Sequence, residues 1–117
     1  MPVALSASTL KGDAIKNLND EKLGDLEEIV IDLESGRVAY GVLAAGGFLG
    51  MGEKFFAIPW DMFTVDADDH SLVVDLNKEV LDDAPGFDKD NWPLTDDRDY
   101  ISEVYDYYRV EPYWVTR

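Results

Sequence analysis

The chain has 117 residues, of which 46% are hydrophobic, so it is long enough for one domain with a packed core and short for two. Its 25 acidic and 10 basic side chains give a formal net charge of -15, and the basic residues are scattered among acids. This pattern argues against direct binding to nucleic acid and to anionic membrane surfaces. The absence of cysteine excludes disulfides, thiolate zinc sites and a cysteine nucleophile.

Residues 1–12 are small and polar with little periodicity, and we expect a loose N-terminal lead-in. This segment lacks a positively charged start followed by a long apolar run, and no later segment is apolar for long enough to span a bilayer. We therefore expect a soluble, cytoplasmic protein with no membrane insertion.

Two short strands are predicted next. Residues 14–18 predict the first strand, which stops at an Asn-Asp turn pair. In the second, Ile29, Ile31 and Leu33 alternate with mostly charged residues, as expected for a half-buried strand. Gly36 is suited to the positive φ angle of the turn that follows.

Residues 38–44 predict a third strand, and small residues on one of its faces suggest close approach by a neighbouring backbone. A glycine-rich turn at residues 46–52 leads into a strand at 54–58, which Pro59 should end because proline cannot donate to a ladder.

The last predicted strands cover residues 62–65 and 72–76, around a polar turn at 66–70. About six short strands without a long intervening helix predict an all-β fold, a small closed antiparallel barrel over residues 13–87.

Composition shifts after Phe87, and residues 88–117 predict an extension with one helix at about 96–109. Acids crowd the first turn of this helix, and Tyr100, Val104 and Tyr108 recur at helical spacing. We expect the helix to pack on the barrel or on a partner subunit.

Several runs resemble the PRC-barrel family, a small β-barrel shared by the cytoplasmic part of the photosynthetic reaction centre H subunit and a ribosome maturation factor. The resemblance is strongest at Leu23-Gly24, at residues 46–60 and 78–87, and in the tail at 87–93, 103–108 and 112–114. It covers roughly residues 8–114. Over this length the chain is similar to stand-alone bacterial members of the family. The extra N-terminal domain of the ribosome factor and the membrane helix of the reaction-centre subunit do not appear in the sequence, so those two functions are not carried over whole.

No motif predicts catalysis or a cofactor. The glycine run lacks a Gly-Lys-Ser/Thr ending and a following helix, so a structural turn is favoured over a phosphate loop. His70, the single imidazole, lies in a predicted polar turn, whereas a catalytic set would need it buried beside a serine. The serines lie in the lead-in, turns, a strand edge and the helix.

The acidic groups at residues 66–69, 82–83, 88–90 and 96–97 lack the spacing of a calcium-binding loop. Turns, a helix cap and solvated surface are the preferred interpretation, with adventitious cation binding left open. We therefore expect no catalytic residue, no cofactor and no metal site.

Aromatic residues are more abundant than a six-stranded barrel is expected to hide, since each buried ring removes about 150–250 Å² from water. One interpretation is that the C-terminal helix folds back over its own barrel. The other is a protein contact surface, with the candidate residues Phe48, Leu49, Met51, Trp60, Trp92, Tyr113 and Trp114.

We therefore predict a non-enzymatic protein-interaction module that forms a symmetric homodimer, and we leave open a second partner, a basic protein. One alternative is an enzyme or small-ligand carrier that uses the barrel mouth near Trp60. A second alternative, which the resemblance alone implies, is an adaptor to ribosomal or RNA-processing assemblies through a basic protein.

Overall fold

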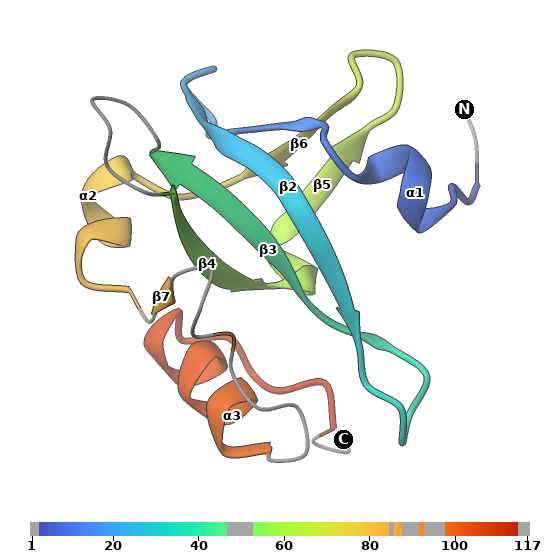
Figure 1. Ribbon diagram of the computed structural model, residues 1–117, viewed down its shortest axis with the longest axis vertical. Coiled ribbons are helices and arrows are strands. Elements are labelled where there is room, and N and C mark those ends of the chain that lie inside the picture. The colour runs from blue at the N-terminus through green and yellow to red at the C-terminus, as the bar shows by residue number, and fades with distance from the viewer. Residues whose placement is uncertain (1–2, 47–52, 85, 88–91, 93–97, 115–117) are drawn as a thin grey trace.

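The computed structural model describes residues 3–46, 53–84, 86–87, 92 and 98–114. Figure 1 shows a strongly coiled sheet with helix α3 packed beside it. The strands are β1 Ala14–Lys16, β2 Lys22–Ile31, β3 Val38–Gly46, β4 Glu53–Pro59, β5 Phe63–Asp66, β6 Ser71–Val74 and β7 Gly86–Phe87. The helices are α1 Ala7–Leu10, the 3-10 turn η1 Trp60–Met62, α2 Lys78–Asp82 and α3 Arg98–Tyr107.

The seven strands form one sheet in the order β5-β6-β1-β2-β3-β4-β7. This confirms the predicted β-rich fold but not the closed antiparallel barrel. Strand β1 pairs in parallel with β6, and β5 and β7 do not pair with each other among the described residues. Sequence alternation shows which face of a strand is apolar but not which strand lies beside it. The parallel pairing of β1 with β6 could therefore not be predicted.

The central meander of β2, β3 and β4 follows the predicted pattern. Strand β4 ends at Pro59, as expected, and Gly36 adopts a φ of 74° in the β2–β3 turn. Strand β2 is longer than predicted because its first residues pair with β1. Leu33 was predicted on the apolar face of the strand, but it lies in the turn and is 92% exposed.

Three short elements were not predicted. Residues 7–10 form α1 in place of a loose lead-in, because Ser6 caps the helix by accepting a hydrogen bond from the Thr9 amide and Leu10 is buried in the core. Strand β7 pairs with β4, and α2 buries Leu81. Segments of two to five residues are too short to show a periodic pattern.

Two apolar clusters occupy opposite faces of β3 and β4. Leu43, Phe56 and Ile58 point into the inner cluster, together with Ile15 and Leu72. The outer cluster lies against α3 and contains Ala39, Tyr40, Val42, Ala44, Phe55, Ala57, Phe87 and Val104. Ala39 and Gly41, the small residues predicted on one face of β3, lie on opposite faces. Ala39 belongs to the outer cluster, whereas a Cβ atom at Gly41 would meet Phe63 and Leu26 of the inner cluster.

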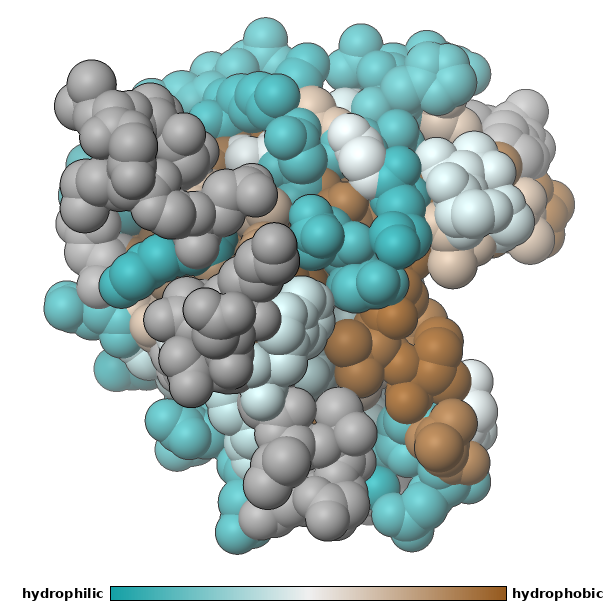
Figure 2. Space-filling view, viewed as in Figure 1, coloured by the Kyte–Doolittle hydropathy of each residue, from teal (hydrophilic) through white to brown (hydrophobic). Residues whose placement is uncertain are grey.

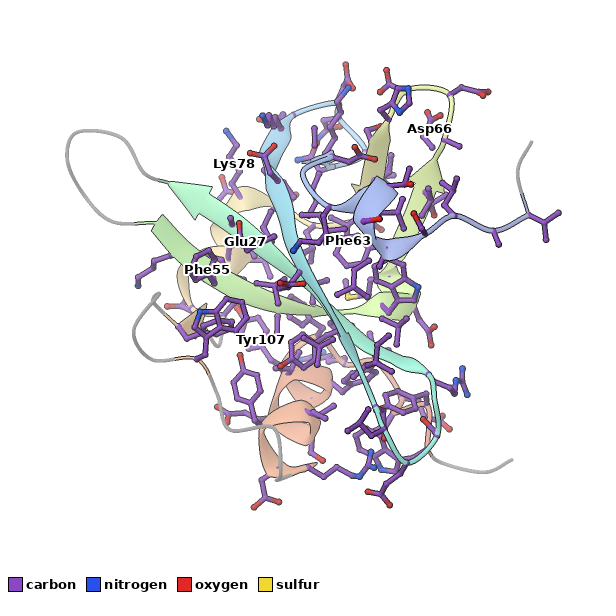
Figure 3. The ribbon with its side chains drawn as sticks, turned by 45° about the vertical axis from the view of Figure 1, so that its right-hand side comes forward. Glu27, Phe55, Phe63, Asp66, Lys78 and Tyr107 are labelled. Atoms are coloured by element: carbon purple, nitrogen blue, oxygen red, sulfur yellow. The ribbon has the colours of Figure 1, made fainter. Side chains whose placement is uncertain are left out.

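Helix α3 packs against β3 and β4 of its own chain. Val104 and Tyr105 are buried, and the Tyr105 hydroxyl donates a hydrogen bond to the Ala39 carbonyl. The Tyr107 hydroxyl donates to the Val80 carbonyl at 2.5 Å, which ties α3 to α2. Figure 3 shows Phe63 within the curled sheet and Tyr107 on the side that carries α3. Among the described residues, no helix combines the length and apolar character required to cross a bilayer.

Candidate functional site

An apolar groove of about 490 Å³ lies beside Trp60, and we call it the Trp60 groove. Its walls come from the N-terminal segment, from β2 and the start of β3, and from η1 and β5. The lining residues are Val3, Ala4, Leu5, Ala7, Leu10, Ile29, Ile31, Val38, Trp60, Val65 and Ala67. All of these side chains are aliphatic except the indole of Trp60. Figure 2 shows apolar surface on this face, between α1 and the end of the β2–β3 hairpin.

The groove follows from a mismatch in strand length. Strand β1 pairs with β2 only as far as Asp25, and the last backbone bonds on that side join Leu26 to Asp13 and to Gly12. Residues 27–31 of β2 therefore pair with β3 alone, within the described part of the chain. Strand β5 in turn pairs with β6 alone. The Trp60 groove lies between these two free strand edges.

Trp60 is held at the corner between β4 and β5. Pro59 precedes it in an extended conformation, and the η1 turn then carries the chain into β5. The indole packs 5.4 Å from the Phe63 ring, and Trp60 contacts the inner cluster while remaining partly exposed. The chain therefore turns directly after Pro59, where the preceding strand was predicted to end.

Acidic residues stand next to lining residues along the chain. Asp61 follows Trp60, and Asp66 and Asp68 alternate with two lining residues of the β5 end. All three are exposed, and we call them the acidic rim. Nearby, Lys11 is already paired with Glu28 at 3.1 Å. The groove thus has apolar walls, and exposed acids adjoin its Trp60 and β5 residues in the sequence.

The structure does not bring the predicted contact residues together. Phe48, Leu49 and Met51 lie outside the described residues. Trp92 is 41% exposed and packs on Phe55 and Phe87 at ring distances of 5.4 and 4.8 Å, on the outer-cluster side of the sheet.

Tyr113 and Trp114 belong to a third place, the Asp32 clasp, formed by Asp32, Arg98, Tyr113 and Trp114. The buried Asp32 carboxylate accepts hydrogen bonds from Arg98 Nη1 at 2.9 Å and from the Tyr113 hydroxyl at 2.5 Å. The Arg98 guanidinium lies 4.7 Å from the centre of the Trp114 ring. The clasp therefore fastens the C-terminal tail to the end of β2.

The electrostatics of the clasp follow from these contacts. The hydrogen bond from Tyr113, followed by that from Arg98, holds the pKa of Asp32 well below its usual range. Burial, with the neighbouring carboxylate, raises the pKa of Tyr113 to about 12. Sequence reasoning missed this site because Asp32 and Tyr113 lie 81 positions apart. The one local signal is the turn at Asp32, in which the carboxylate accepts a hydrogen bond from the Glu34 amide.

The polar residues weighed for catalysis or metal binding lie apart from the groove lining. His70 is exposed in the β5–β6 turn with a φ of 54°. In the same turn, Asp69 pairs with Lys16 at 3.1 Å and accepts from Ser71 at 2.9 Å. Across the part of the chain that the structure describes, no three His, Asp or Glu side chains converge on a possible metal position.

Two buried tyrosine hydroxyls have no hydrogen-bond partner among the described residues, those of Tyr100 and Tyr108. Burial raises the pKa of both groups, so they stay protonated at neutral pH. Both rings pack against the outer cluster and lie outside the lining of the Trp60 groove.

The chain matches a protein-family model and is similar to solved structures. The family model described as PRC-barrel domain matches residues 2–81. Among solved structures, the chain is similar to a putative 16S ribosomal RNA processing protein, RimM, from Pseudomonas aeruginosa, with 13% identity and a TM-score of 0.45. That similarity covers 67% of this chain and 47% of the other, so the chain spans about half the length of that protein. No curated protein sequence matches the chain.

Proposed function

The chain belongs to the PRC-barrel domain family, and from this premise we propose that it is a non-enzymatic protein-interaction module that binds another polypeptide through the Trp60 groove. We also infer that the sheet forms a small, incompletely closed barrel around the inner cluster. This curled sheet holds the groove walls in fixed positions.

The observation that carries this proposal is the apolar lining of an exposed groove. Ile31 is 46% exposed and Leu5 40%, although both line the same apolar groove. Contiguous exposed apolar surface with a polar border is typical of protein contact sites. A catalytic or ligand pocket needs convergent polar groups, whereas no lining side chain carries a carboxylate, hydroxyl, imidazole or ammonium group. The lining therefore supports a polypeptide partner over the enzyme alternative.

Quantitative affinity capture from the native cell tests the proposal with two matched variants. Ile31→Ser removes one exposed isoleucine from the groove, and Leu18→Ser removes a 68% exposed leucine outside it. Burial of one such side chain is worth about 1.5 kcal/mol, so we expect Ile31→Ser to reduce partner yield on the order of tenfold. Leu18→Ser should capture the same partner at the wild-type level. Equal yields from both variants, or no specific partner at all, would contradict the proposal.

The homodimer is a separate prediction. Trp92 favours it, because this side chain is exposed on the side of the sheet opposite the Trp60 groove. Light scattering at micromolar concentration should give twice the chain mass of 13.2 kDa, and Trp92→Ala should shift the mass toward the monomer. A wild-type mass near 13.2 kDa would refute the dimer and leave the groove proposal standing.

The adaptor to ribosomal or RNA-processing assemblies also stays a prediction. A net charge of -15 disfavours direct contact with RNA, so such an adaptor would bind a basic protein. The amount of this basic protein captured should fall as the salt concentration rises and should be unchanged by nuclease treatment.

A further inference from the structure

The free edge of β2 and the apolar groove beside it point to one kind of occupant. We infer that the Trp60 groove receives an extended segment of another protein, in which apolar and basic side chains alternate, and that this segment pairs with the backbone of residues 27–31. The inference rests on the proposed function and specifies the partner's chemistry.

The backbone of β2 carries the first step. On the side away from β3, the backbone hydrogen bonds of β2 end at Leu26, which bonds with Asp13 and Gly12. Residues 27–31 have no strand neighbour there in the described part of the chain. Five residues of strand extend about 17 Å. Unpaired N–H and C=O groups along such an edge are a template for an added strand, whereas a helix would leave them unpaired.

The side chains carry the second step. Ile29 and Ile31, two positions apart on β2, both line the groove, while Val30 between them packs against the outer cluster. Trp60 and Val65 line it from the opposite wall. A strand added beside β2 would direct every second side chain to the same face as Ile29 and Ile31. Apolar residues at those alternate positions would fill the groove.

Charge carries the third step. The remaining side chains of an added strand would point away from the groove, as Asp66 of the acidic rim does, because it alternates with the lining residue Val65 on β5. All three acids of the rim are exposed. Lys11, the nearby cation, is already paired with Glu28. A second copy of the chain carries the same net charge of -15 and is disfavoured on this border, whereas a segment with lysine or arginine at alternate positions matches it.

The test titrates the full chain with an N-acetylated, C-amidated heptapeptide of alternating valine and lysine, followed by NMR and amide hydrogen exchange. We expect saturable binding and slower exchange at the outward-facing amides of residues 27–31. Ile31→Ser should weaken the peptide Kd on the order of tenfold, and Leu18→Ser should leave it unchanged. Affinity should fall as the salt concentration rises.

Two control peptides separate the parts of the inference. A valine–glutamate peptide tests charge, and a valine–lysine peptide that is N-methylated at alternate amides tests strand pairing without altering charge; both should bind at least tenfold more weakly. Equal binding of either control, or no saturable binding of the parent peptide, overturns the inference. Dimerisation of the free protein that Ile31→Ser abolishes would assign the groove to a second copy and also overturn it. If capture from cells still depends on Ile31, the proposed function survives that failure.

Discussion

Gly24→Ala should lower the free energy of unfolding by about 3 kcal/mol, because strands β2 and β3 cross too closely at Gly24 to admit a side chain. A Cβ atom at this position would lie 2.1 Å from the Ala44 carbonyl oxygen and 2.7 Å from Leu43 Cδ1. The first of these atoms belongs to the backbone of a central strand that is buried on both faces, so it cannot move without disturbing both clusters. Urea unfolding measures the loss.

Gly36→Ala is the matched control for this effect. Gly36 has a φ of 74°, but nothing lies within 4 Å of its hypothetical Cβ atom. Alanine there meets backbone strain without a clash, and we expect a loss of about 1 kcal/mol. If Gly24→Ala proves no more destabilising than Gly36→Ala, the close crossing of β2 and β3 is wrong.

Asp32→Ala should destabilise the fold by about 2 kcal/mol, since it removes the acceptor at the centre of the Asp32 clasp. The Arg98 guanidinium and the Tyr113 hydroxyl both lose their bonds to Asp32, and so does the Glu34 amide in the turn. Glu34→Ala is the control, because Glu34 is an exposed partner of the same arginine and should contribute little. If the clasp were only a surface ion pair, urea unfolding would show the same loss in the free energy of unfolding for both variants.

The clasp also makes stability depend on pH in a defined direction. The folded pKa of Asp32 is depressed below its ordinary value of 3.8, so its contribution is present above pH 3.8 and is lost as the pH falls toward the folded pKa. The stability difference between wild type and Asp32→Asn should therefore be largest near about pH 7 and shrink below about pH 4. An unchanged difference across that range would mean that the carboxylate is not held ionised by Tyr113 and Arg98.

The sequence predicted the local features of this fold well. The shared face of Ile29 and Ile31 in β2, the end of β4 at Pro59 and the positive φ of Gly36 all follow from residue chemistry within a few positions. The parallel β1–β6 pair and the bond between Tyr113 and Asp32 join segments far apart in the chain. No periodicity encodes such pairings, so the open sheet order and the clasp could not be predicted.

The aromatic residues illustrate the same limit. A six-stranded barrel was expected to leave many rings uncovered, but α3 adds a second cluster that buries Tyr40, Phe55, Phe87 and Tyr105. Among the described aromatic residues, Trp92 is the one that remains exposed.

The open apolar surface that remains is largely aliphatic, with Ile31 and Leu5 exposed beside Trp60. Alternation did predict that Ile29 and Ile31 share one face of β2. It could not show that β1 stops too early to pair with residues 27–31, which leaves the edge of β2 free beside the groove.

Site-specific photocrosslinking in the native cell tests the central claim most directly. Ile31→benzoylphenylalanine places the reactive group in the Trp60 groove, and Leu18→benzoylphenylalanine places it on exposed surface elsewhere. We predict one discrete protein adduct from position 31 that is absent from position 18. Adducts that are the same from both positions, or no adduct from position 31, would contradict the assignment of the groove as the surface that binds other proteins.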